Sequence, residues 1–157
     1  MRLAACATAL VYTGSLHAHH NSGLFDTTTP IRVKGHIAEV HFANPHSMIF
    51  IDVMSSDGQR VRWAVENSGT AAMTRQRGFD EQSLRVGDAI EVCGYAPKRP
   101  YSTVEELAAK GIARPASWWG NWDKIMTGRL LILKSGPAEH WSHYGPLDAC
   151  RSLLESE

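Results

Sequence analysis

The sequence lacks the motifs that would assign a chemistry at once. It has only three cysteines, and no Cys-x-x-Cys spacing occurs, which argues against covalent c-type haem and thioredoxin-like chemistry. It has no His-Glu-x-x-His motif, no glycine-rich phosphate loop and no dinucleotide fingerprint. No serine stands in a Gly-x-Ser-x-Gly context. We therefore do not expect an enzyme from these patterns.

An excess of charge of one sign is also lacking. Lys plus Arg and Asp plus Glu number 16 each, which gives a formal net charge of +0. Nucleic-acid binding normally needs a basic excess, so a nucleic-acid partner is disfavoured. No apolar run approaches the ~20 residues that span a bilayer. With 157 residues and no internal repeat, the chain is expected to form one domain.

The N-terminus has the pattern of an export signal. Residues 3–12 form a short apolar run after Arg2, and the stretch 15–18 offers a small residue before a cut. Cleavage after Ala18 removes residues 1–18 and leaves a domain of residues 19–157 in the periplasm or outside the cell. One alternative is a lipoprotein signal ending at Cys6, although only five residues precede it. The other is an N-terminal strand that stays attached.

The cysteines agree with export. Loss of the signal leaves Cys93 and Cys150, and an even pair in an exported chain predicts a disulfide. Such a bond closes a loop of about 57 residues and stabilises the fold by ~4 kcal/mol on the chain-entropy estimate. It would tie the C-terminal tail, residues 135–157, to a central strand.

Alternation of apolar and polar residues in the first and third segments, and short apolar runs in the others, predict five strands. Asp57-Gly58 predicts a tight hairpin between the second and third of them. Three strands, a short helix and two further strands is the order of an OB-fold, an all-β, five-stranded antiparallel Greek-key barrel. An open antiparallel sheet with one covering helix is the rival architecture. The predicted strands are residues 31–40, 48–53, 59–66, 89–95 and 129–133, with the helix at 70–77.

A tryptophan-rich insertion, residues 96–126, separates the last two strands. Ser102 and Glu105 form a capping box that begins a short helix there. Tryptophans beside a barrel mouth stack well on apolar or aromatic ligands. The alternative is a satellite cluster that covers the barrel. The candidate ligand-binding residues are Tyr101, Trp118, Trp119 and Trp122, with Trp141 of the tail as a further member.

Several motifs, in order and spacing, resemble a family of small exported bacterial proteins that is catalogued as a domain of unknown function. The resemblance covers about residues 18–95 and, more loosely, 127–134. It departs from the family pattern at Asn21, which interrupts the usual His-His-Ser, and in the long insertion. It implies an exported OB-like barrel and no established reaction. The motifs are His19-His20-Asn21-Ser22, Phe25-Asp26, Val33-Lys34-Gly35, Asn44-Pro45-His46, Trp63-Ala64-Val65-Glu66 and Leu84-Arg85-Val86-Gly87-Asp88 through Gly94-Tyr95.

His19, His20 and His46 are the candidate metal ligands. Cleavage after Ala18 places a free amine and two imidazoles within two residues, and such nitrogen donors suit copper, with zinc as the alternative. His46 lies in the first inter-strand loop, and Asp26 is a possible oxygen donor. The competing interpretation is a hydrogen-bonded histidine in a turn beside a frayed terminus. The other histidines are expected to have structural roles.

We therefore expect an exported binding or accessory module. Its ligand is a metal ion, copper first, or an apolar or aromatic molecule at the tryptophan insertion. Two alternatives of other classes are a small copper-dependent oxidoreductase that uses the same histidines and a pure protein–protein interaction subunit with a periplasmic partner. Glu66 and Asp88 are the carboxylates that acid–base chemistry would need, but Asp88 follows a glycine as an ordinary turn residue does, so no catalytic residue is assigned.

Overall fold

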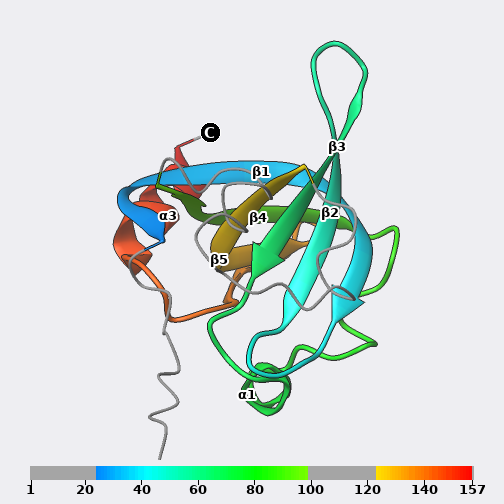
Figure 1. The fold of residues 1–157 in the computed structure, drawn as a ribbon, viewed down its shortest axis with the longest axis vertical. Helices are drawn as coiled ribbons and strands as arrows, with labels where there is room; N and C mark the ends of the chain where they lie inside the picture. The colour runs from blue at the N-terminus through cyan, green and yellow to red at the C-terminus, as the bar shows by residue number, and fades with distance from the viewer. Residues whose placement is uncertain (1–23, 99–122, 157) are drawn as a thin grey trace, which may run out of the picture.

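The fold was obtained as a computed structural model, which describes residues 24–98 and 123–156. Figure 1 follows the chain from blue to red. The elements are β1 (Phe25–His41), β2 (Met48–Met54), β3 (Arg60–Glu66), α1 (Ala71–Gln76), β4 (Ala89–Pro97), β5 (Lys124–Leu133), β6 (Ala138–His140) and α3 (Leu147–Glu155).

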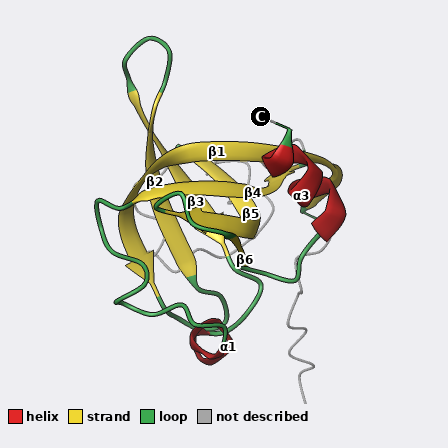
Figure 2. Cartoon of the chain, turned by 180° about the vertical axis from the view of Figure 1, so that it is seen from behind, coloured by secondary structure: helices red, strands yellow, loops and turns green. Residues whose placement is uncertain are grey.

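Five of the strands close into a barrel. Their order in the sheet is β3-β2-β1-β4-β5, with β6 added to β5, and these neighbours pair antiparallel. The first and last of the five, β3 and β5, also pair with each other in parallel, from Trp63 opposite Lys124 to Glu66 opposite Thr127. This pairing closes the sheet on itself (Figures 1 and 2). The predicted OB-like barrel is confirmed, and the open sheet is wrong.

The alternation of the strands creates two apolar clusters. Inward-facing side chains such as Ile49, Ile51 and Val65 are fully buried and fill the barrel. Trp141 belongs to this interior cluster, with its ring 5.2 Å from that of Phe79 in an edge contact. Because Trp141 is 0% exposed, its predicted place in a ligand cleft is wrong.

The second cluster lies on the outer face of the sheet. Its strand residues include Phe50 and Tyr95, and α3 packs against it through Leu147, Leu153 and Leu154. Figure 2 shows α3 beside β1 and β4 at one edge of the barrel. The predicted disulfide is present in this cluster and joins Cys93 of β4 to Cys150 of α3.

A bulge in β5 ties the C-terminal tail to the barrel. Cys93 pairs with Leu130 and Gly94 with Gly128, so Arg129 is the extra residue between them. The buried guanidinium of Arg129 donates to the carbonyl oxygens of Gly145, at 3.0 Å, and Ser142. Both carbonyls belong to the tail, so Arg129 fixes the position of the segment that carries Trp141, whose side chain packs inside the barrel.

The turn chemistry of the sequence is found where it was expected. Gly58 has a φ of 79° in the β2–β3 hairpin, which stands clear of the barrel in Figure 1. The side chain of Thr70 accepts a hydrogen bond from the Met73 amide and caps α1, while Gly78, with a φ of 90°, follows its end. The helix predicted at 70–77 is therefore confirmed to within one residue at each end.

The structure differs from the predicted elements in three places. β1 begins at Phe25 and not at residue 31. Residues 26–30 are polar or proline and show no alternation in the sequence, but in the structure Phe25 pairs with Pro97 and Pro30 with Tyr95 of β4. β5 begins at Lys124 because its first four residues pair with β3, so the insertion is shorter than the predicted 96–126. The sequence analysis did not predict β6 or α3.

No helix within residues 24–98 and 123–156 is long and apolar enough to cross a membrane.

Candidate functional site

Two of the motifs quoted above meet at one end of the barrel. His46 lies just before β2, and Glu66 is the last residue of β3. Nδ1 of His46 and Oε1 of Glu66 form a hydrogen-bonded ion pair. The Asn-Pro-His and Trp-x-x-Glu motifs therefore form one site although 20 residues separate the two side chains.

The loop that carries His46 is held by polar contacts to the segment around α1. Asn44 accepts a hydrogen bond from the Ala71 amide at 3.2 Å. The Ser47 amide donates to the Gly69 carbonyl at 3.3 Å, and its carbonyl accepts from the Asn67 amide at 2.9 Å. These bonds fix the backbone on both sides of the histidine, so the imidazole has a defined position over β3.

Burial and the carboxylate of Glu66 shift the pKa of His46 in opposite directions. The side chains of Glu66 and His46 are 9% and 22% exposed. The hydrogen bond that His46 donates to Glu66 raises the pKa of His46, and burial lowers it by less, so the net direction is upward. A carboxylate can only accept, so Nδ1 carries the proton, and in the neutral imidazole the lone pair is on Nε2. Within the described residues, Nε2 has no hydrogen-bond partner.

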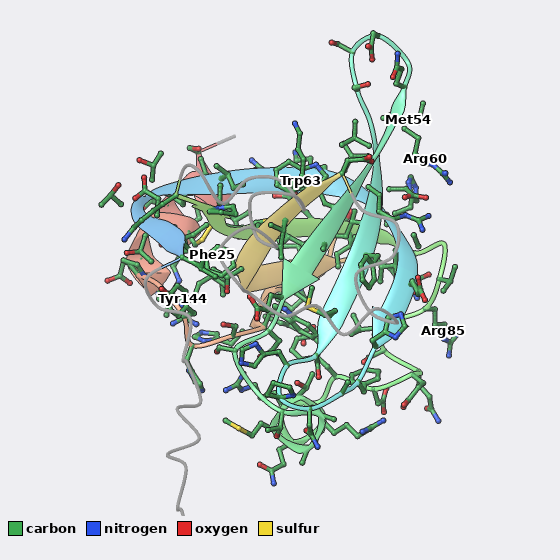
Figure 3. The ribbon with its side chains drawn as sticks, in the orientation of Figure 1. Phe25, Met54, Arg60, Trp63, Arg85 and Tyr144 are labelled. Atoms are coloured by element: carbon green, nitrogen blue, oxygen red, sulfur yellow. A yellow bond between two sulfur atoms is a disulfide. The ribbon has the colours of Figure 1, made fainter. Side chains whose placement is uncertain are left out.

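An aromatic pair borders this site. The phenol of Tyr144 has its pKa raised by burial and, to a lesser degree, by the negative charge of Glu66. Its ring lies 5.9 Å from that of Phe25 in an edge contact, and Figure 3 shows the two side by side. Phe25 is the first residue of β1, so β1 begins on the Tyr144 side of the barrel.

The candidate metal ligands are therefore placed only in part. His46 is in the site described here, whereas His19 and His20 lie outside the described residues. Asp26 accepts hydrogen bonds from the Thr28 amide and hydroxyl, at 3.0 and 2.6 Å, and these bonds lower its pKa. Among residues 24–98 and 123–156, no three His, Cys, Asp or Glu side chains gather closely enough to hold a metal. The copper site stays a prediction.

The tryptophan site also stays a prediction. Tyr101, Trp118, Trp119 and Trp122, with the capping box at Ser102 and Glu105, lie outside the described residues.

The remaining titratable candidates have separate partners. Asp88 pairs with Lys134 at 2.8 Å and Glu66 with His46, so the two carboxylates do not form one acid–base pair. His41 pairs with Glu39 at 2.6 Å.

His140 and His143 lie in and just after β6 and are exposed. For His140, burial and then the charge of Arg129 lower the pKa. For His143, Arg77 is the main cause of a lowered pKa.

The pairing of His46 with Glu66 is the feature of this candidate site that the sequence analysis missed. The sequence analysis named both residues, but assigned His46 to a metal site and weighed Glu66 as an acid–base group. The signal was available, because both residues end motifs of the same resembled family and both stand at strand ends. What the sequence could not give was the register that brings those two strand ends together.

Residues 8–104 match a family described as "Family of unknown function (DUF6152)", and the chain belongs to that family. The matched range includes His19, His20, His46 and Glu66, and it ends before the three tryptophans of the insertion. No curated protein matches the chain.

Proposed function

We propose that this protein is an exported binding module for a transition-metal ion, copper first and zinc second, held by His46 together with His19 and His20. The observation that carries the proposal is the contact between Glu66 and Nδ1 of His46. A carboxylate on one ring nitrogen sets the tautomer, orients the ring and makes the other nitrogen a better ligand, as in many metal sites. If the role of His46 were purely structural, Nε2 would have no partner among the described residues, whereas in a metal site it would be the ligand atom.

The place where the chain enters the barrel supports this ligand set. Phe25 packs against the ring of Tyr144, the negative charge of Glu66 helps to raise the pKa of Tyr144, and Glu66 pairs with His46. Four residue steps separate His20 from Leu24, so an extended chain gives His20 a reach of about 14 Å from that point. Cleavage after Ala18 would add the amine of His19 to the imidazoles, and three or four nitrogens suit Cu(II).

The test is a copper titration of protein cleaved after Ala18, followed by calorimetry and by the nitrogen hyperfine pattern in electron paramagnetic resonance. We expect His46→Gln to weaken copper binding by about 100-fold or more, because it removes a ligand. Glu66→Gln removes only the orienting carboxylate and should cost about 10- to 100-fold. His143→Gln is the matched control and should change nothing, since His143 is exposed and outside the proposed ligand set.

Two results would overturn the proposal. One is an affinity for copper and zinc no better than millimolar in the cleaved protein. The other is tight binding that His46→Gln leaves unchanged, which would place the metal on the N-terminal residues alone. If copper does bind, turnover with ascorbate or peroxide would distinguish a redox enzyme from a carrier.

A further inference from the structure

A group of basic side chains gathers around the segment that leads from β6 to α3 (Figure 2). We call this group the basic cluster. Among residues 24–98 and 123–156, none of its members forms an ion pair with a carboxylate. The members are Arg77 at the end of α1, Arg129 of β5, His140 and His143 of the segment itself, and Arg151 of α3.

Hydrogen bonds to one short piece of backbone bring two of the guanidiniums close together. Nη1 of Arg77 donates to the carbonyl oxygen of Trp141 at 3.0 Å, and Nη1 of Arg129 donates to that of Ser142, the next residue. The carbonyl oxygen of Arg129 in turn accepts from the Trp141 amide at 3.1 Å. Consecutive carbonyls of the segment therefore fix the positions of both cations.

Arg129 is a buried cation without an ionised partner in the part of the chain that the structure describes. It is 7% exposed, and a buried charge is normally paired because its removal from water is costly. Its Nε and Nη1 donate to backbone carbonyls, whereas Nη2 donates to no described residue. Among the described side chains, the buried polar atoms without a partner are Asp88 Oδ2 and Trp141 Nε1, so Nη2 of Arg129 is in reach of solvent. Such a donor suits an anion that approaches from outside.

The shifts in pKa agree with the proximity of these groups. Burial lowers the pKa of Arg129 most, and the charge of Arg77 lowers it further. The pKa of His140 is lowered by burial and then by three arginines, of which Arg129 has the largest effect. For His143, Arg77 is the largest cause of a lowered pKa, followed by burial. No described carboxylate contributes to these three shifts, so a positive potential dominates here.

The neighbouring carboxylates do not neutralise the basic cluster. Glu139 precedes His140 in β6, and successive residues of a strand point to opposite faces. Glu66 is already paired with His46. Asp148 lies in the first turn of α3 and forms no ion pair within the described ranges.

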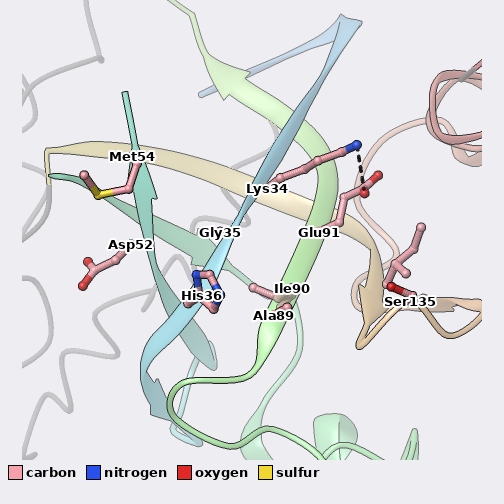
Figure 4. Close-up of a pocket in the computed structure, with 10 residues that line it drawn as sticks. Lys34, Gly35, His36, Asp52, Met54, Ala89, Ile90, Glu91 and Ser135 are labelled. Carbon is pink, nitrogen blue, oxygen red and sulfur yellow. Dashed lines mark ion pairs between the residues drawn. The ribbon is translucent and has the colours of Figure 1, made fainter. Parts of the chain in front are cut away.

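A groove between β1, β2 and β4 has a different balance of charge (Figure 4). Two carboxylates, those of Asp52 and Glu91, line it together with one lysine, Lys34, which pairs with Glu91 at 3.6 Å. This region therefore serves as a negative control for the binding of anions.

We propose that the basic cluster binds a small tetrahedral dianion, namely sulfate, hydrogen phosphate or a phosphate monoester, between Arg77 and Arg129, with His140 at its rim. Two guanidiniums without a carboxylate favour a doubly charged ligand. Four tetrahedral oxygens can accept from donors of different elements, whereas a planar carboxylate is matched by one guanidinium fork. The site is independent of the metal proposal, because none of its residues is a proposed metal ligand.

The first test is a sulfate titration of the mature, metal-free protein at constant ionic strength, followed by calorimetry and by NMR of the histidine rings. Sulfate is the probe because its charge does not change between pH 5.5 and pH 8, and methanesulfonate is its monoanionic match. We expect saturable shifts at His140 and His143 but not at His36 in the groove of Figure 4. Methanesulfonate should bind about tenfold or more weakly. The proposal is overturned by equal affinity for the two anions or by no saturation up to about 20 mM sulfate.

Two further anions distinguish the possible sources of the ligand. Phosphate and phenyl phosphate at pH 8 carry the same tetrahedral group, free in one case and attached to an organic body in the other. Phenyl phosphate that binds as tightly as sulfate supports a monoester on a larger molecule. Binding of sulfate and phosphate alone supports the free ion.

The pH dependence of sulfate binding is a second test. The pKa of His140 lies below 6.5 in the free protein, so a bound dianion should raise it and cause the uptake of a proton. By linkage, sulfate should bind about fivefold or more tightly at pH 5.5 than at pH 8. An affinity that stays constant or falls as the pH decreases contradicts the proposed site.

The third test uses variants with matched controls. Arg77→Gln should weaken sulfate binding about tenfold or more, while the carbonyl that it releases keeps its hydrogen bond from Asn67 at 2.7 Å. His140→Gln changes an exposed position and should remove most of the pH dependence. Arg85→Gln and Lys34→Gln each remove one exposed cation elsewhere and should change the affinity less than about twofold. Unchanged affinity in Arg77→Gln, unchanged pH dependence in His140→Gln, or an equal loss in the controls overturns the proposal.

Discussion

Replacing both Cys93 and Cys150 with alanine should lower the free energy of unfolding by about 4 kcal/mol. The magnitude follows from the 57 residues between the two cysteines, because the cross-link removes loop-closure entropy from the unfolded chain. Both cysteines are fully buried in the outer cluster, and alanine leaves no polar group unpaired there. Since a domain is commonly stable by only about 5–15 kcal/mol, this loss is large.

The assay is denaturant unfolding of three samples: oxidised wild type, reduced wild type and the double-alanine variant. The last two should agree within about 1 kcal/mol, because both lose the same cross-link. At about 2–4 °C per kcal/mol, the melting temperature should fall by roughly 10 °C. Hydrogen exchange should accelerate first at Leu153 in α3, while Ile49 in the barrel interior stays protected.

A loss below about 1 kcal/mol would refute this reasoning. It would mean that the tail already lies close to the barrel strands in the unfolded or partly folded chain, through Arg129 and α3, so that the disulfide removes little additional entropy. Equal acceleration of exchange in α3 and the barrel would refute the second half, namely that the disulfide protects the outer cluster before the interior.

Two further predictions concern single side chains. Gly145→Ala should destabilise the fold by about 3 kcal/mol or more, because a Cβ there would lie 2.2 Å from the Tyr95 ring. The control is Gly87→Ala, at a similar φ of 89° but with no atom nearby, which should cost only about 1 kcal/mol. Equal losses of the free energy of unfolding in the two variants would show that the contact with the Tyr95 ring is not the cause. In metal-free protein, the raised pKa of His46 stabilises the fold fully below pH 6.5, the value for an unfolded histidine, and that contribution is lost as the pH rises through the folded pKa. The stability difference between wild type and His46→Gln should therefore shrink from pH 5.5 to pH 9, and a difference that grows with pH would contradict the ion pair with Glu66.

Much of the barrel was predictable because its strands carry local signals. Residues 48–53 form a short run of apolar, strand-forming residues, residues 59–66 alternate over part of their length, and Asp57-Gly58 marks the turn between them, so both strands were placed to within a residue. The start of β5 carried no such signal. Thr127-Gly128 looks like a turn in the sequence, but in the structure it lies in the middle of a strand whose first half is held by β3.

The same distinction between local and long-range information applies to the site. The sequence identified His46 and Glu66 as notable residues, because each closes a recognisable motif. Their contact depends on the pairing of Met48 with Glu66, which no local pattern encodes.

Closure of the barrel by β3 and β5 has a consequence for the order of events in folding. Trp63 of β3 pairs with Lys124 of β5, which follows about sixty residues later in the chain, and the interior cluster is complete only when Trp141 has packed into it. While a chain is synthesised from its N-terminus, the edge of β3 that pairs with β5 stays exposed until β5 has been made. Such high contact order predicts slow folding, and a chaperone that shields this edge would have the longest interval in which to act.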